Sequence, residues 1–301
     1  MKMNKIVAIS LILIAIVGFF ILTQQDSNNS IRKEIKETSK EITPIDTITH
    51  GHGLAVDVAD PSRVYIATHH GLLVLTKDKD LNRIGTAQDD YMGFAPHPND
   101  PKVLFSSGHP STGGNIGFQK SEDGGFTWDK VSDGIQGPVD FHTMAISPVN
   151  PNLIYGWYQG TLQRSIDQGE TWEIATTTNY PIVNLAADPK DENTIYAATP
   201  QGLLVSKDKG AKWNTLLDGF VSVVAIHPQN SQKLLSFSEK NGLAQSNNGG
   251  KNWEKLSETF NGETLLFIAF NKQDPEILYT LTEKNSIYKS SDGGNSWNKV
   301  R

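Results

Sequence analysis

Histidine and aspartate side chains that could do chemistry are concentrated in the first half of this 301-residue chain. A neutral imidazole can bind a transition metal or exchange a proton near neutral pH, and a carboxylate can act as an acid, a base or a cation ligand. The candidate residues are six of the eight histidines and three aspartates: His50, His52, His69, His70, His109, His142, Asp89, Asp90 and Asp140. Because they are far apart in the sequence, only a fold that joins distant segments can bring them together.

The first of three alternatives for these residues is a metal site. Two or three neutral imidazoles with a carboxylate suit a divalent transition metal such as zinc, copper, nickel or iron. The candidate ligands are His52, His109 and His142. The cofactor expected under this alternative is a divalent transition metal, although the short His-Gly-His and His-His pairs do not by themselves indicate one.

The second alternative is a glycoside hydrolase. Such enzymes place two carboxylates on either side of the scissile bond, one as the acid and the other as the base or nucleophile. Asp89, Asp90 and Asp140 are the candidate catalytic residues. His109 or His142 could share a proton with them or tune their acidity.

The third alternative, and the leading hypothesis, is a binding module without enzymatic activity. Its ligand would be an extracellular glycan, a protein or a small molecule, and binding needs no defined catalytic constellation. Aromatic side chains join the histidines here, since a pair such as Trp157 and Tyr158 could stack on a sugar ring. The candidate ligand-binding residues are His50, His52, His69, His70, Tyr91, His109, Asn115, His142, Trp157 and Tyr158.

An octapeptide of the form S-x-D-x-G-x-x-W recurs along the chain and indicates which elements position these residues. Successive copies start 40 to 45 residues apart, at Thr76 for a degraded first copy and then at Ser121, Ser165, Ser206, Ser246 and Ser290. A period of about 40 to 50 residues is typical of one four-stranded blade of a β-propeller. The predicted fold is therefore all-β, a six-bladed propeller over residues 44–301.

Each recurring position of the octapeptide has a structural role. The aspartate can accept hydrogen bonds from the turn between the third and fourth strands, the glycine can adopt a positive φ, and the tryptophan can cover the hairpin. In the first unit we predict strands over residues 54–58, 64–68, 72–75 and 82–85. Ring closure is expected to use residues 45–49 or side-chain packing between the first and last blades.

The octapeptide resembles the Asp-box, or BNR, repeat of sialidases, sortilin-type receptors, xyloglucan-degrading glycosidases and photosystem II assembly factors. The resemblance covers about residues 50–301 and most closely suggests small bacterial propellers described as glycosyl-hydrolase-like. It implies that the repeat holds the fold together away from the ligand face. The octapeptide aspartates are therefore not expected to be catalytic: Asp123, Asp167, Asp208 and Asp292, with Asn248 in their place in one copy.

Sialidase chemistry is not expected, even though sialidases carry this repeat. The resemblance implies an arginine triad, an R-I-P segment and a Tyr-Glu pair in a sialidase. Within the predicted propeller only Arg63, Arg83 and Arg164 precede the terminal arginine, and no R-I-P string occurs.

The propeller topology sorts the candidate residues onto one face. Loops between successive blades, and between the second and third strands of a blade, open on one face, whereas the proline-centred turns and the octapeptides lie on the other. The two remaining histidines, His97 and His227, belong to proline-centred turns. The candidate residues map to the opposite face over the first three blades, where an expanded loop, residues 106–118, also lies.

Composition excludes several classes of function. The net charge is −6 and no basic block is present, which argues against a nucleic acid as a partner. The chain has no cysteine, so disulfides, thiolate metal ligands and a lipid on an N-terminal cysteine are excluded.

The N-terminal segment is predicted to be an uncleaved membrane anchor over residues 1–23. Lys2 and Lys5 precede an apolar run, residues 6–22, that is long enough as a helix to span a bilayer. Residues 24–43 form a polar stalk, and the positive-inside rule puts the propeller outside the cytoplasm. We therefore expect a single-pass protein of the cell membrane, or a secreted protein if residues 1 to about 26 are cleaved.

Overall fold

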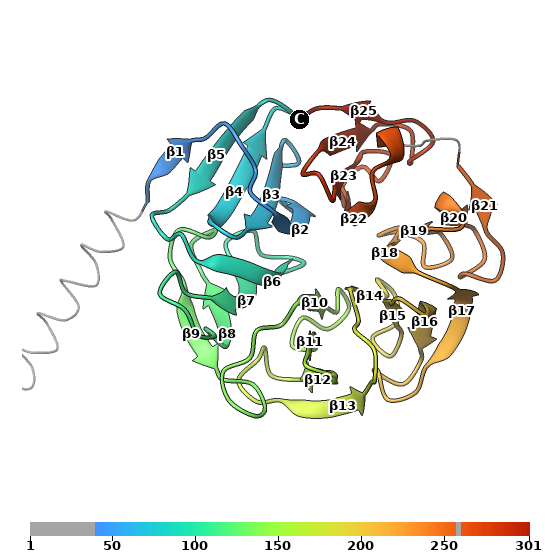
Figure 1. Ribbon diagram of the computed structural model, residues 1–301, viewed down its shortest axis with the longest axis horizontal. Coiled ribbons are helices and arrows are strands. Elements are labelled where there is room, and N and C mark those ends of the chain that lie inside the picture. Colours follow the sequence, from blue (N-terminus) through green and yellow to red (C-terminus); the bar gives the residue numbers. More distant parts are fainter. Residues whose placement is uncertain (1–39, 257–259) are drawn as a thin grey trace, which may run out of the picture. The chain divides into compact units, whose positions relative to one another are not determined.

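The structure, a computed structural model, describes residues 40–256 and 260–301. Residues 42–301 form one compact unit in which six sheets follow one another around a central axis (Figure 1). Apart from the short 3-10 turn η1 (Phe260–Gly262), the regular elements of the described residues are strands. The prediction of an all-β propeller with six blades is confirmed.

Each blade contains four consecutive antiparallel strands, with the first strand nearest the axis. Blade one consists of β2 (Gly51–Val56), β3 (Arg63–Thr68), β4 (Gly71–Thr76) and β5 (Asp80–Ile84). Blade two consists of β6 (Asp90–Pro96), β7 (Leu104–His109), β8 (Phe118–Ser121) and β9 (Asp129–Ser132). Blade three consists of β10 (Thr143–Ile146), β11 (Ile154–Tyr158), β12 (Thr161–Ser165) and β13 (Glu173–Thr177). Blade four consists of β14 (Asn184–Ala187), β15 (Ile195–Ala198), β16 (Gly202–Ser206) and β17 (Asn214–Asp218). Blade five consists of β18 (Val221–Ile226), β19 (Leu234–Ser238), β20 (Gly242–Ser246) and β21 (Glu254–Lys255). Blade six consists of β22 (Leu265–Phe270), β23 (Leu278–Thr282), β24 (Ile287–Ser290) and β25 (Asn298–Lys299).

The octapeptides form the turns between the third and fourth strands, as their residue types predict. In blade three, Ser165 Oγ accepts a hydrogen bond from the Gly169 amide at 2.7 Å, and Asp167 Oδ1 accepts one from the Thr171 amide at 2.9 Å. Gly169 has a φ of 90°, in the left-handed region that favours glycine. A Cβ atom at Gly169 would meet the ring of Phe118 in blade two at 2.0 Å, so this glycine also allows neighbouring blades to pack closely.

The hydrophobic core is divided among the interfaces between neighbouring blades. Between blades two and three, for example, Phe118 and Phe141 pack together with the octapeptide residue Trp172. The described residues contain six such clusters, which correspond to the six contacts around the ring. Because no blade buries its apolar surfaces alone, the six blades depend on one another.

The ring closes by side-chain packing between blades one and six. Ile66 of β3 and Leu281 of β23 belong to one buried cluster. Ile45 and Ile48 also pack against this cluster. The residues just before them form a short strand, β1 (Ile42–Pro44), that pairs with the outer strand β5 of blade one. Blade one is therefore a five-stranded sheet, and β1 begins inside the segment that was predicted to be stalk.

Four inner strands contain a β-bulge close to the face on which the sequence placed the candidate residues, called the histidine face below. The registers shift between Gly51 and Gly53 in β2, Tyr91 and Phe94 in β6, Val221 and Val223 in β18, and Leu265 and Phe267 in β22. A bulge leaves the extra residue outside the ladder and redirects its side chain. The residues at these bulges include His52, Met92, Ser222 and Leu266.

The predicted membrane anchor and most of the predicted stalk, up to residue 39, lie outside the described residues. Among the residues that are described, no helix is long and apolar enough to span a membrane. The anchor and the location outside the cytoplasm therefore stay predictions.

Candidate functional site

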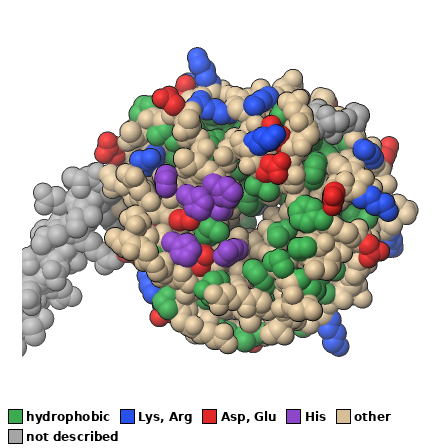
Figure 2. Space-filling view, in the orientation of Figure 1, with side chains coloured by type: hydrophobic (Ala, Val, Ile, Leu, Met, Phe, Trp, Pro, Cys, Tyr) green, Lys and Arg blue, Asp and Glu red, His purple; other side chains and the backbone are tan. Residues whose placement is uncertain are grey.

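The histidine face carries a group of imidazoles beside the central opening of the ring. Figure 2 shows these side chains close to one another, with carboxylates between them, whereas hydrophobic side chains surround much of the rest of the opening. The group consists of two clusters, one centred on blade one and the other on the junction of blades two and three.

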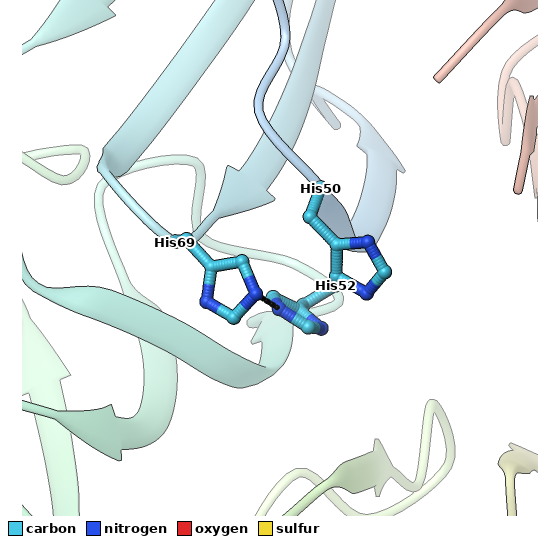
Figure 3. Close-up of side chains that lie close together, drawn as sticks. All are labelled: His50, His52 and His69. Atoms are coloured by element: carbon cyan, nitrogen blue, oxygen red, sulfur yellow. Dashed lines mark hydrogen bonds between the residues drawn. The ribbon is translucent and has the colours of Figure 1, made fainter. Parts of the chain in front are cut away.

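The first cluster contains His50, His52 and His69, together with Asp90 of the next blade. The Nε2 atoms of His52 and His69 are 3.2 Å apart, and the ring of His50 stacks on that of His69 with their centroids 5.1 Å apart (Figure 3). On its other side, His69 donates from Nδ1 to Asp90 Oδ2 at 2.5 Å. Residues from β2, the β3–β4 hairpin and β6 therefore meet at one point.

Burial makes His52 a neutral imidazole at physiological pH. Removal from water lowers the pKa of His52 to about 3, and the neighbouring His69 and His50 act in the same direction. The carboxylate of Asp140 opposes this effect, so the two clusters interact electrostatically.

The second cluster consists of two histidines that converge on a buried carboxylate. His109 Nε2 and His142 Nε2 lie 2.9 Å and 3.1 Å from the same oxygen, Oδ2 of Asp140. Asp140 is only 2% exposed, whereas the side chains of His109 and His142 are 41% and 51% exposed. The hydrogen bond to Asp140 raises the pKa of His142, although partial burial opposes the change.

A cavity of about 390 Å³ opens on the histidine face, and every blade contributes to its lining. His50, His52 and His142 lie on one side, Trp157 lies next to them, and the other blades supply mainly apolar side chains. All four bulge residues named above also line it: His52, Met92, Ser222 and Leu266. A second cavity, of about 420 Å³, lies between the inner strands and shares His52 and Phe267 with the first.

Four of the candidate residues line this cavity: His50, His52, His142 and Trp157. Three others belong neither to its lining nor to the two histidine clusters. Asp89 Oδ1 accepts the Ser111 amide at 3.0 Å and so holds the expanded loop of blade two. Tyr91 is buried in the core with its ring centroid 5.0 Å from that of Trp128, and burial raises its pKa. His70 is exposed beside a different, smaller cavity, and its Nδ1 atom donates to the His69 carbonyl at 2.7 Å.

The remaining polar candidates connect the expanded loop to blade three. Asn115 Nδ2 donates to the hydroxyl of Tyr158 and to the Pro138 carbonyl, each at 2.9 Å. These contacts fix the loop whose Gly114 carbonyl accepts a hydrogen bond from His109 Nδ1 at 2.8 Å. Asn115 and Tyr158 therefore position His109, whereas Trp157 faces the cavity itself.

Sequence reasoning missed the apolar side of the cavity, which blades four to six provide. Phe220 and Phe267 lie there, and Phe220 is 37% exposed. The available signal was Phe220, a large hydrophobic residue in the loop before β18, at the level where blades one to three carry histidine or aspartate. The bulges that turn Ser222 and Leu266 toward the axis had no comparable signal in the sequence.

Comparison with known proteins identifies relatives of the propeller but no family. No protein-family model matches the chain. A protein of Neosartorya fischeri named "Probable oligoxyloglucan-reducing end-specific xyloglucanase" is 28% identical over 156 residues, which are 46% of this chain and 18% of that protein. The chain therefore corresponds to about a fifth of the length of the curated relatives that it matches.

Two kinds of solved structure share the fold. The GH74 xyloglucanase from Xanthomonas campestris superposes with a TM-score of 0.58 at 18% identity, over 82% of this chain and 45% of the other. YCF48 from Cyanidioschyzon merolae has a TM-score of 0.54 at 16% identity, over 87% and 88% of the two chains. The chain is thus a six-bladed propeller that resembles xyloglucanase and YCF48 propellers.

Proposed function

We propose that this protein is a glycan-binding propeller whose ligand occupies the cavity on the histidine face. The observation that carries the proposal is the composition of that cavity. Its volume, about 390 Å³, is within the range of small-ligand sites, and its lining combines Trp157, Phe220 and Phe267 with imidazoles. Aromatic rings pack against the apolar faces of sugar rings, and imidazoles exchange hydrogen bonds with sugar hydroxyls.

The relatives support a glycan as the class of ligand. The curated proteins that match by sequence are named as xyloglucanases, and a structure of such an enzyme shares the fold. A xyloglucan oligosaccharide is therefore the first ligand to test.

Binding accounts for the site better than hydrolysis does. A glycosidase needs one carboxyl group that can protonate the leaving group and another that can reach the sugar or a water molecule. Here Asp140 is buried beneath two histidines, Asp90 accepts a hydrogen bond from His69, and Asp89 accepts the Ser111 amide. Each candidate carboxylate therefore already contacts the protein through one of its two oxygen atoms.

Titration calorimetry with xyloglucan oligosaccharides tests the proposal. We expect Trp157→Ala and Phe220→Ala each to weaken binding by about tenfold or more, because each removes an aromatic surface from the cavity. The matched control is Ile166→Ala, which removes an exposed hydrophobic side chain from an octapeptide turn on the opposite face. Equal affinities for the wild type and all three variants would contradict the proposal.

The same samples test the enzymatic alternative. Release of reducing ends from xyloglucan by the wild-type protein, abolished by Asp90→Asn or Asp140→Asn, would replace the binding function by a hydrolase. If the wild-type protein binds the oligosaccharides and leaves them intact, the binding function stands.

We further propose that the propeller acts outside the cytoplasm, attached to the membrane through residues 1–23. The support is the apolar run of residues 6–22 behind two lysines. Protease added to intact cells should remove the propeller, and alkaline extraction should leave the chain with the membrane. Protection of the propeller from protease in intact cells would contradict this location.

A further inference from the structure

Three imidazole nitrogens, one each from His50, His52 and His69, lie within 4.8 Å of one another. The pair from His52 and His69 is 3.2 Å apart. Two nitrogens that bind one tetrahedral zinc ion at about 2.0–2.1 Å are about 3.4 Å apart, so this pair has the separation of metal ligands.

The hydrogen bond to Asp90 determines which nitrogen of His69 is available to an ion. A carboxylate only accepts, so His69 Nδ1, 2.5 Å from Asp90 Oδ2, carries the proton, and Nε2 presents its lone pair toward His52. A carboxylate behind a metal-binding histidine has this role in many proteins, because it fixes the tautomer and makes the ring a stronger ligand.

Asp90 also has an oxygen atom that the described part of the chain leaves without a hydrogen bond. Its Oδ1 atom is buried and lies 3.7 Å from His52 Nε2. Buried polar atoms without a partner are uncommon in native proteins and indicate an ion, a water molecule or a functional role. A cation held by the three imidazoles, or a water molecule bound to that cation, would satisfy this oxygen.

The three histidines come from short, well-anchored segments. His52 lies at the bulge of β2, and His69 lies in the tight turn between β3 and β4. His50 has a φ of 34°, which is unusual for a residue other than glycine, and the next amide, that of Gly51, donates to Asn285 Oδ1 at 3.0 Å. A backbone anchored in this way favours a metal site, because binding then requires only adjustment of the side chains.

We infer that His50, His52 and His69 form a binding site for one divalent transition metal ion of the class that imidazole prefers, with zinc as the reference ion. Asp90 is the positioning residue behind His69. This set differs from the predicted His52, His109 and His142, because the latter two converge on Asp140.

The site joins the cavity through two of its ligands. His50 and His52 line the cavity, so the coordination position that three imidazoles leave open faces the space where a ligand would lie. The ion would contact an oxygen atom of that ligand or a water molecule. The metal site does not depend on the ligand being a glycan.

Zinc titration of the full-length protein, purified in detergent with its affinity tag removed and its metals stripped, tests the inference. We expect the wild-type protein to bind one zinc ion per chain and to gain thermal stability. We expect His52→Ala and His69→Ala each to weaken zinc binding at least about hundredfold, and Asp90→Asn to weaken it about 10- to 100-fold.

His70→Ala is the matched control, since His70 neighbours His69 in the sequence but turns to a different cavity. His109→Ala tests the second cluster, and both of these variants should bind zinc as the wild type does. No stoichiometric zinc in the wild type, or unchanged binding by His69→Ala, would overturn the inference. Loss of zinc by His109→Ala would overturn the assignment to His50, His52 and His69.

Cobalt provides a measurement that needs no variant. The wild-type protein loaded with Co²⁺ should show the visible absorption of an ion bound by imidazoles in fewer than six positions, and its absence would count against the site even if a histidine variant failed to fold. Magnesium and calcium, which prefer oxygen ligands, should not compete with Co²⁺. Oligosaccharide binding measured with and without zinc separates this inference from the proposed function, because either can fail while the other stands.

Discussion

At the scale of single residues, two histidines of one face respond to their surroundings in opposite ways. His52 is largely withdrawn from water beside two other imidazoles, so its pKa is lowered to about 3. His142 is half exposed and donates to the buried Asp140 carboxylate, so its pKa is raised. The first effect comes from burial and the second from a hydrogen bond, and together they give the protein a predictable dependence on pH.

The folded state should bind fewer protons at His52 than the unfolded state does. A lowered pKa in the folded state means that the stabilising contribution is complete above the unfolded value, about 6.5, and is lost as the pH falls toward the folded value. In urea unfolding with a chelator present, the wild type should lose more stability between pH 7 and pH 5 than His52→Gln does. The difference is at most about 1.4 kcal/mol per pH unit, because one proton is involved.

His142→Gln is the internal control for this pH dependence. The pKa of His142 is shifted in the opposite direction, upward, in the folded state. The stabilising contribution of His142 is therefore complete below the unfolded pKa of about 6.5 and is lost as the pH rises through the folded pKa. The wild type should therefore exceed His142→Gln in stability most at low pH. Parallel curves for the wild type and His52→Gln would show that His52 is not held neutral by the fold.

At the scale of elements, the octapeptide turns and the bulges occupy opposite ends of the blades and have different roles. The turns use the same hydrogen bonds in blades two to six, and blade five retains them with asparagine, since Asn248 Oδ1 accepts the Asn252 amide at 2.9 Å. The bulges instead turn side chains such as His52 out of the sheet and toward the cavity. Stability of the blade and composition of the site can therefore vary independently.

Asp167 provides a test of the role of the turns. Its carboxylate accepts hydrogen bonds from the amide and the hydroxyl of Thr171, and these bonds lower its pKa. We expect Asp167→Ala to reduce the free energy of unfolding by about 1–2 kcal/mol, because two donors lose their acceptor at a partly exposed site.

Asp167→Asn is the conservative comparison. It should retain most of the stability, because Asn248 makes the corresponding amide bond in blade five. Urea unfolding measures both variants, and oligosaccharide and zinc affinities should stay at wild-type values. A change in either affinity would mean that the turn influences the histidine face.

At the scale of the whole molecule, closure of the ring relies on packing and a few polar contacts, since blades one and six share no strand pairing among the described residues. Leu281 is fully buried in the cluster that joins these blades. Near the periphery, Lys289 Nζ and the hydroxyl of Tyr279 both lie 2.6 Å from carboxylate oxygens of Asp78 in the degraded octapeptide. Apolar burial should dominate, because partly exposed ion pairs contribute little.

Two substitutions separate these contributions to closure. We expect Leu281→Ala to reduce the free energy of unfolding by about 2–5 kcal/mol through lost burial and a cavity. Lys289→Ala should cost only about 0–1 kcal/mol. Denaturant unfolding followed by tryptophan fluorescence measures both, and a larger loss for Lys289→Ala would mean that the ion pair, not the packing, holds the ring closed.

The sequence by itself determined the architecture. Octapeptides spaced by 40 to 45 residues specified six blades, because each copy encodes a local turn whose hydrogen bonds lie within five residues of one another. The alternation of loops then assigned the histidines to one face, and the structure brings His50, His52 and His69 together there. The prediction of six blades succeeded because local turn chemistry and strand order are properties of the chain itself.

Only the tertiary structure decided which side chains meet. The bulge of β2 turns His52 toward His69, whereas Tyr91 enters the core and Asp89 bonds a loop, although each lies at or next to the start of an inner strand. A shift of one residue in a strand reverses the direction of a side chain, and the sequence pattern does not reveal such shifts. The apolar half of the cavity depends likewise on closure of the ring, which brings blades that are distant in sequence around one axis.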